Sequence, residues 1–184
     1  MQCRPKFILI AVLGLGLVSG VVPIQEVAAD EPIHGTGDVL QWLIPATGFA
    51  ATYMHADPEG RRQFLPSMVM ALAITAGLKE TVREERPNGG AHSFPSGHTS
   101  SAFQGASFLQ RRYGWQWGIP AYAAAAYTGW SRVELKAHHP HDVFAGAAVG
   151  ILSSYVFTTP YLKNLEVSAV VETDYVGLSM RTTW

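Results

Sequence analysis

Residues 131–142 read SRVELKAHHPHD, and this stretch lies between two apolar segments, so that it ends one predicted helix and begins the next. Pro140 favours the first position of a helix, because proline lacks a backbone N–H and has a fixed φ. Asp142 then lies in the first turn, where the helix dipole stabilises a negative charge. From there its carboxylate can reach one ring nitrogen of His138, four residues earlier, and turn the other nitrogen outward. The stretch therefore predicts two helices joined by a loop that holds an oriented imidazole.

Apolar segments on both sides of this stretch predict an all-α bundle of about five core helices. The segments cover residues 39–54, 64–78 (with a pattern that continues to about residue 83), 100–109, 119–130 and 143–157. We expect Asp38 to cap the first helix and Pro120 to begin the fourth. Gly146 and Gly150 would let the fifth helix approach a neighbour closely. With 184 residues, 48% of them hydrophobic, the chain fits one helical domain with a large buried core.

The two ends of the chain do not follow the helical pattern. Arg4 and Lys6 precede an apolar run, and small residues lie just before residue 30, which predicts a secretory signal peptide. An uncleaved anchor helix is the alternative, although the apolar run is shorter than the ~20 residues that a membrane span needs. Near the C-terminus, LEVSAVV and YVGLSMRTTW alternate in hydrophobicity and predict a β-hairpin. The predicted domains are a signal peptide (1–29), a helical domain (30–163) and a C-terminal hairpin tail (164–184).

Charge and cysteine content exclude several classes of function. Removal of residues 1–29 takes two basic and one acidic residue from the 13 and 14 of the whole chain, and the remaining net charge of −2 leaves no basic field to recruit nucleic acid. Cys3, the one cysteine, lies inside the predicted signal peptide, so the exported chain would have no disulfide and no thiol nucleophile. The apolar segments are between core and span length, so their lengths alone leave the membrane question open. Their small residues favour helix-on-helix packing in water or in a membrane, and we expect association with a membrane.

A basic cluster is predicted at the end of the second helix. Residues 79–87 read KETVREERP, and they place Lys79 and Arg86 close to a helix C-terminus. Such cations could bind an anion, or they could simply interact with the helix dipole. Arg132, in the stretch quoted first, adds a forked donor that suits an oxyanion.

A third polar cluster precedes the third helix, where residues 93–101 read SFPSGHTSS. A tight turn here would point the backbone N–H groups of Ser96, Gly97 and His98 toward an anion at the helix N-terminus. The hydroxyl of Ser96 adds a donor, and His98 can release a proton near neutral pH. An ordinary N-cap formed by Ser96 or Thr99 is the alternative.

Together the three clusters resemble the three-part signature of the type 2 phosphatidic acid phosphatase superfamily, which also contains the vanadium haloperoxidases. The first part runs from Lys79 to Arg86-Pro87, the second is PSGH at residues 95–98, and the third joins Ser131-Arg132 to His138 and Asp142. All three parts occur in the order and spacing of the family, over about residues 37–160. The resemblance implies a helical bundle of the kind found in this superfamily.

The resemblance also implies a role for each matching position. His138 would attack phosphorus, Asp142 would orient it, and His98 would protonate the leaving oxygen. Water would then hydrolyse the phosphohistidine, with His98 as the base. Cationic side chains and backbone amides would neutralise the phosphate, so no metal or other cofactor is expected. The residues that would hold the phosphate oxygens are Lys79, Arg86, Ser96, Gly97 and Arg132.

These roles predict a metal-independent phosphatase exported to the cell envelope of a bacterium. It would be associated with the inner membrane, with its site facing the periplasm, or it would be soluble in the periplasm. The apolar segments favour lipid phosphates as substrates, such as phosphatidic acid, phosphatidylglycerol phosphate or a polyprenyl diphosphate, and no nucleic-acid partner is expected. The alternatives are a soluble periplasmic acid phosphatase of broad specificity, a vanadate-dependent haloperoxidase and a non-enzymatic envelope protein.

A metal site is the competing interpretation of the stretch quoted first. His139, His141 and Asp142 form a dense set of possible ligands. No second cluster in the sequence completes the coordination, however, and Asp142 is better used to orient His138. Membrane members of the superfamily usually have six spans, whereas five apolar segments follow the predicted signal peptide.

Overall fold

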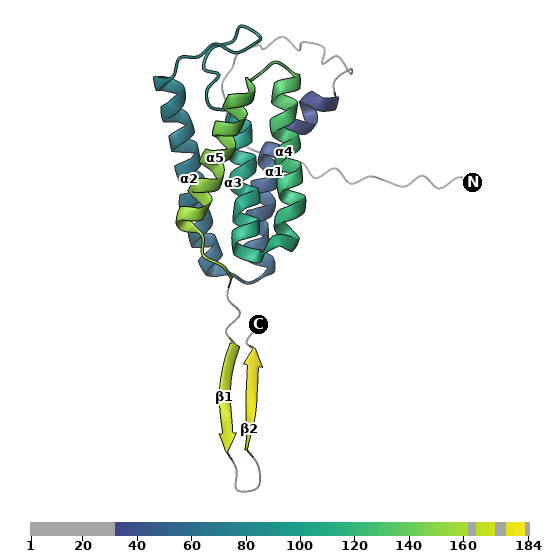
Figure 1. The fold of residues 1–184 in the computed structure, drawn as a ribbon, viewed down its shortest axis with the longest axis vertical. Helices are drawn as coiled ribbons and strands as arrows, with labels where there is room; N and C mark the ends of the chain where they lie inside the picture. Colours follow the sequence, from purple (N-terminus) through teal and green to yellow (C-terminus); the bar gives the residue numbers. More distant parts are fainter. Residues whose placement is uncertain (1–31, 162–164, 172–175, 183–184) are drawn as a thin grey trace, which may run out of the picture. The chain divides into compact units, whose positions relative to one another are not determined.

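The computed structural model describes residues 32–161, 165–171 and 176–182 of the chain. Five helices form an all-α bundle (Figure 1), and this confirms the predicted fold class. The helices are α1 (Pro32–Met54), α2 (Pro58–Thr81), α3 (Gly97–Tyr113), α4 (Trp115–Glu134) and α5 (Pro140–Phe157). The strands β1 (Leu165–Val171) and β2 (Val176–Thr182) pair antiparallel, with Val167 opposite Met180.

Helix α3 contacts each of the other four helices. Its buried side chains are mostly small, and Ala102 and Ala106 are fully buried. Small residues on α5 also bring that helix very close to α3. A Cβ atom added at Gly146 would lie 2.5 Å from the Ser96 carbonyl oxygen, and one added at Gly150 would lie 2.4 Å from the Ser100 carbonyl oxygen. The predicted close approach of the fifth helix is therefore confirmed.

The two helix starts predicted from Asp38 and from Pro120 are wrong. Helix α1 begins at Pro32, so Asp38 lies inside the helix and does not cap it. Helix α4 begins at Trp115, directly after Gly114, and Pro120 lies inside it. Gly114 has φ 94°, a left-handed conformation that only glycine adopts easily. It ends α3 and redirects the chain in a single residue, which leaves no loop between the two helices for Pro120 to follow.

A buried ion pair holds together the end of the bundle where α1 meets α2. Asp57 caps α2 by accepting a hydrogen bond from the Gly60 N–H at 2.8 Å. Arg112, near the end of α3, donates to both carboxylate oxygens of Asp57, from Nη2 at 2.6 Å and from Nε at 2.7 Å. The Tyr113 hydroxyl donates to the same carboxylate at 3.0 Å. Because both partners of this forked pair are buried, it fixes the α1–α2 loop against α3.

None of the helices in the part of the chain that the structure describes combines the length and the apolar character needed to cross a membrane. The predicted signal peptide and Cys3 lie outside the described residues.

Candidate active site

The three sequence clusters lie at one end of the helical bundle. They follow the C-terminus of α2, precede the N-terminus of α3 and join α4 to α5 (Figure 1). Two backbone hydrogen bonds link the parts. The Ser96 N–H donates to the Asp142 carbonyl at 3.0 Å, and the His138 N–H donates to the Arg132 carbonyl at 3.1 Å. Lys136, with φ 53°, turns the chain after α4 so that His138 folds back against the end of that helix.

His138 and Asp142 lie side by side in the interior, as their spacing predicts. The His138 Nδ1 atom is 3.4 Å from Asp142 Oδ2 and 3.5 Å from the Ser93 hydroxyl. Ser93 donates a hydrogen bond to the same Asp142 oxygen at 2.5 Å, and the His139 backbone N–H donates to it at 2.8 Å. Nδ1 thus faces two acceptors, which favours the tautomer with hydrogen on Nδ1 and a lone pair on Nε2.

The surroundings of His138 favour the neutral imidazole. Burial, together with the positive charges of Lys79 and Arg86, lowers its pKa to about 4, while Asp142 acts in the opposite direction. Burial alone would raise the pKa of Asp142, but hydrogen bonds from Ser93 and the His139 N–H hold it below its ordinary value. A neutral imidazole beside an ionised carboxylate can act as a nucleophile and tolerate the positive charge that grows on it.

Lys79 and Arg86 supply the positive field around this histidine. Lys79 Nζ donates to the His92 carbonyl at 2.7 Å, which holds the ammonium group against the loop between α2 and α3. Its Cε atom is 4.0 Å from the position of a Cβ atom built on Gly97, so it also lies beside the start of α3. Arg86 Nε is buried and has no hydrogen-bond partner among the described residues. Lys79 therefore lies near the helix N-terminus that the sequence predicts as an anion site, and the charge of Arg86 acts on His98 in the first turn of that helix.

Ser96 is the N-cap of α3. Its hydroxyl oxygen accepts hydrogen bonds from the Thr99 N–H at 3.4 Å and from the Thr99 hydroxyl at 3.0 Å. The side chain is completely buried, so the ordinary capping role holds for this hydroxyl. Gly97 and His98 form the first turn of the helix, where backbone N–H groups have no partner within the helix.

Asp38 connects His98 with Arg132. Its Oδ1 atom accepts hydrogen bonds from Arg132 Nη1 at 2.7 Å and from His98 Nε2 at 3.0 Å. Burial lowers the pKa of His98, the charges of Arg132 and Arg86 lower it further, and Asp38 acts against them. A Cβ atom on Gly37 would lie 2.3 Å from Arg132 Nη2, so only glycine there leaves room for the guanidinium.

All the sequence-predicted site residues lie at this end of the bundle, but two functional candidates escaped the sequence reasoning. Ser93 contacts both members of the His138–Asp142 pair, and Asp38 contacts both His98 and Arg132. Ser93 lies two residues before the PSGH motif, so its proximity was the available signal. Asp38 was interpreted as a helix cap, and nothing near it in the sequence indicates its contact with His98 and Arg132.

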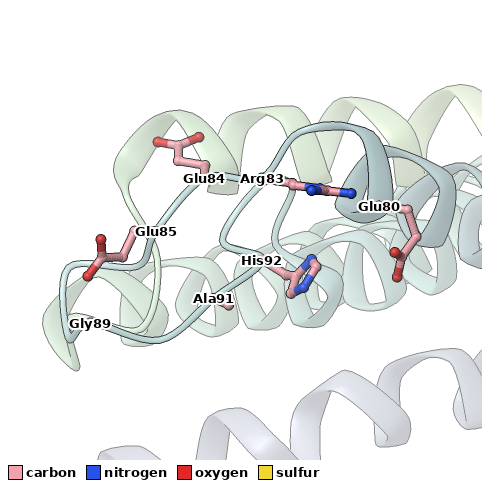
Figure 2. Close-up of a pocket in the computed structure, with 7 residues that line it drawn as sticks. All are labelled: Glu80, Arg83, Glu84, Glu85, Gly89, Ala91 and His92. Carbon is pink, nitrogen blue, oxygen red and sulfur yellow. The ribbon is translucent and has the colours of Figure 1, made fainter.

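A separate hollow of about 510 Å³ lies on the outer side of the loop between α2 and α3. Figure 2 shows its lining residues, with the Glu84 side chain pointing away from the His92 ring. None of the predicted site residues lines it. Its lining residues are Glu80, Arg83, Glu84, Glu85, Gly89, Ala91 and His92. With three carboxylates against one guanidinium, this hollow is unfavourable for phosphate, and it is distinct from the cluster that the sequence predicts to bind phosphate.

Comparison with known proteins identifies relatives of this chain. The family model of the PAP2 superfamily matches residues 88–166, which contain the second and third parts of the signature. The chain is 37% identical over 99 residues to a lipid A 1-phosphatase of Porphyromonas gingivalis, covering 49% of this chain and 22% of that protein. It is 27% identical over 176 residues to a lipid A 1-phosphatase of Helicobacter pylori, covering 87% of this chain and 90% of that protein.

A solved structure also resembles the bundle. The crystal structure of Aquifex aeolicus LpxE superimposes with a TM-score of 0.61 at 20% identity, over 70% of this chain and 87% of that one. At this identity the likeness concerns the fold, and it agrees with the family match and with the geometry of the three clusters. Residues 88–166 match the PAP2 superfamily, and the relatives and the shared fold support the type 2 phosphatidic acid phosphatase (PAP2) superfamily as the family of this chain.

Proposed function

We propose that this member of the superfamily is a metal-independent lipid phosphate phosphatase that works through a phosphohistidine on His138. Its class, a phosphoric ester hydrolase, follows from the family; the nucleophile, the acid and the substrate are the proposal. The observation that carries it is the buried His138 imidazole, held at Nδ1 by Asp142 and Ser93 within the field of Lys79 and Arg86. That arrangement leaves Nε2 as the attacking atom.

The reaction proceeds in two displacements at phosphorus. In the first, the Nε2 lone pair of His138 forms a bond to phosphorus while the ester P–O bond breaks, and His98 gives its proton to the leaving oxygen. Asp142 stabilises the positive charge that develops on the imidazole. In the second, His98 takes a proton from water as the water oxygen attacks phosphorus, and the N–P bond breaks. The products are the free alcohol, or the lower phosphate, and inorganic phosphate.

Phosphate binding relies on cations and backbone amides. Lys79 and Arg86 are positioned beside the start of α3, and the N–H groups of its first turn add donors. In this structure Arg132 donates a hydrogen bond to Asp38, so a bound phosphate would replace the Asp38 carboxylate as the anionic partner of the guanidinium. Asp38 acts through His98, since its charge favours the protonated acid that the first step requires.

An apolar groove at the same end of the bundle supports a lipid as the substrate. The groove has a volume of about 320 Å³, and it lies between α4 and α5. Its lining includes Val133 and Pro140, which flank the loop that holds His138. An acyl chain in this groove would place its phosphate near His138. The relatives named for lipid A 1-phosphate make that glycosyl phosphate the first substrate to test, ahead of phosphatidic acid and polyprenyl diphosphates.

Association with the bacterial envelope is the proposed location. Large apolar side chains are exposed along one stripe of α5, where Phe144 is 76%, Leu152 65% and Val156 64% exposed. Such a stripe fits contact with lipid acyl chains better than contact with water. The predicted signal peptide would direct the chain out of the cytoplasm. A broad-specificity periplasmic phosphatase is the second candidate, and it would show no preference for lipid substrates.

The test is phosphate release by the purified full chain in the presence of a chelator. Lipid A, phosphatidic acid, a polyprenyl diphosphate and p-nitrophenyl phosphate serve as substrates. We expect metal-free turnover that His138→Ala lowers roughly a thousandfold or more, while the neighbouring His139→Ala remains active. Rapid acid-free quenching and mass spectrometry should detect phosphate on residue 138. Turnover that survives His138→Ala but stops with chelator would support the metal interpretation instead.

A further inference from the structure

Asp142 and three neighbouring polar side chains form a cluster on the side of Asp142 that faces away from His138. Glu84, from the loop between α2 and α3, places Oε1 2.8 Å from His141 Nε2 and 3.9 Å from His139 Nε2. His141 Nε2 is in turn 3.3 Å from Asp142 Oδ1. The ligand atoms of Glu84, His141 and Asp142 all lie within 4.8 Å of one another. Glu84 thus supplies the additional ligand that the sequence, read locally, does not place beside the histidines.

The two carboxylate oxygens of Asp142 have different surroundings. Oδ2 accepts hydrogen bonds from Ser93 and the His139 N–H, and it is the oxygen that faces His138. Oδ1 is buried and accepts no hydrogen bond from the described residues, although His141 lies nearby. A buried carboxylate oxygen without a hydrogen bond is costly, and a cation satisfies it well. This oxygen points into the cluster of Glu84 and His141.

We propose that Glu84, His141 and Asp142 bind a divalent transition metal ion, with Zn²⁺ the best fit. His139 is not a ligand in this proposal, because its Nε2 atom is 3.2 Å from the Glu85 carbonyl oxygen. Imidazole nitrogens with carboxylate oxygens suit zinc, whereas magnesium and calcium prefer oxygen ligands alone. Tetrahedral zinc with bonds of about 2.0–2.2 Å separates its ligands by roughly 3.3–3.5 Å. The His141–Asp142 distance already matches, and the Glu84–His141 pair opens by about half an ångström when zinc replaces the hydrogen bond.

Zinc at this site would inhibit the enzyme, an effect that rests on the proposed function. The metal ion would bind Oδ1 of Asp142 and reduce the negative charge of the carboxylate. His138 depends on that negative charge at Oδ2. The carboxylate would then stabilise less well the positive charge that grows on His138 during attack. Phosphatase activity would therefore need no metal and would fall as zinc binds.

Direct metal binding provides the first arm of the test. The full chain, prepared without a histidine tag, is titrated with Co²⁺, whose visible absorption reports tetrahedral coordination, and then with Zn²⁺ in equilibrium dialysis. We expect one ion per chain, with affinity lowered at least tenfold in Glu84→Gln and in His141→Ala. Glu85→Gln is the matched control, because it removes a neighbouring carboxylate outside the cluster, and it should bind as the wild type does. Absence of binding, or binding that both variants retain, would overturn the site.

Activity on p-nitrophenyl phosphate provides the second arm. Zinc should inhibit the wild type over the concentration range in which it binds, whereas Glu84→Gln and His141→Ala keep their metal-free rate and resist inhibition. Zinc that binds without inhibiting would overturn the regulatory part of the proposal. A wild-type chain without metal-free turnover would contradict the proposed function, while the binding arm would still decide whether the metal site exists.

Discussion

Asp38 Oδ1 lies 2.7 Å from Arg132 Nη1, although 94 residues separate the two positions along the chain. The contact brings α1, which carries no part of the family signature, into the candidate active site. Because the same oxygen also accepts a hydrogen bond from His98, one carboxylate connects the guanidinium that we propose binds phosphate with the proposed acid. Helix α1 is therefore part of the proposed catalytic machinery as well as of the packing.

Replacement of Asp38 by asparagine should change the pH profile. The pKa of His98 already lies below the ordinary 6.5, and Asp38 is the group that opposes this lowering. Since His98 must be protonated in the free enzyme, kcat/KM falls as the pH rises through its pKa. Asp38→Asn should move this alkaline limb to lower pH, measured with p-nitrophenyl phosphate. The exposed Glu134→Gln on α4 is the control, and an unchanged limb in Asp38→Asn would contradict the coupling.

Replacement of Ser93 by alanine should slow turnover more than it weakens binding. The change removes the hydrogen bond to Asp142 and an acceptor near His138 Nδ1, so both groups lose orientation. A hydrogen bond to a charged group is worth about 1.5–3 kcal/mol, which corresponds to a fall in kcat of roughly tenfold to a hundredfold. We expect KM for p-nitrophenyl phosphate to change little. Ser153→Ala, another buried serine, controls for stability, and equal losses in both variants would rule out a positioning role.

A bulky residue in the apolar groove should discriminate between lipid and water-soluble substrates. Ala126 lines the groove between α4 and α5 and is exposed. Ala126→Phe would occupy the space proposed for an acyl chain and raise KM for a lipid phosphate roughly tenfold, since several methylene groups would lose burial. Turnover of p-nitrophenyl phosphate should remain unchanged. Ala123→Phe places the same ring on the same helix outside the groove lining; if it raises KM equally, the groove is not the lipid site.

The Asp57–Arg112 pair should control acid stability. Burial raises the pKa of Asp57, but hydrogen bonds from Arg112, the Gly60 N–H and Tyr113 outweigh it and leave the pKa lowered. The stabilisation is therefore complete above the ordinary pKa of 3.8 and is lost as the pH falls through the lower folded-state value. Asp57→Asn, which keeps a capping side chain, should destabilise the fold at neutral pH by about 3–5 kcal/mol.

Thermal unfolding followed by circular dichroism checks this expectation. The gap between wild type and Asp57→Asn should be widest at neutral pH and should narrow in strong acid, where the wild-type carboxylate becomes protonated. A gap of constant size at every pH would mean that the charge pair does not stabilise the fold. The site residues lie at the other end of the bundle, so the folded variant should keep its kcat.

The sequence predicted most where the signal is local. Apolar segments bounded by proline and glycine identified the five helices, and Pro140 does begin α5 as its chemistry requires. Local spacing also placed Asp142 beside His138. The start of α4 was missed because Gly114 turns the chain in one residue, whereas Pro120 offered a more familiar signal for a helix start.

Contacts between distant segments could not be predicted in this way. Asp38 reaches Arg132, and Glu84 reaches His141 57 residues later, only because helices pack in a particular order. A single sequence predicts the helices but not which helices pack against each other. Contacts between charged residues on different helices therefore cannot be predicted from it. Ser93 lies between these cases, since it is close to a motif but finds its partner 49 residues away.

The closeness of Gly146 to the Ser96 carbonyl sets the distance between α5 and the start of α3 at the candidate active site. A single methyl group at position 146 would push α5 outward by several tenths of an ångström and would carry the proposed nucleophile, two residues before α5, away from the amides of α3. Reaction rates can change roughly a hundredfold with a displacement of about 1 Å. Gly146 therefore controls the distance between the proposed nucleophile and the amides of α3. We expect its replacement by alanine to slow the proposed phosphate transfer, although no polar group is removed.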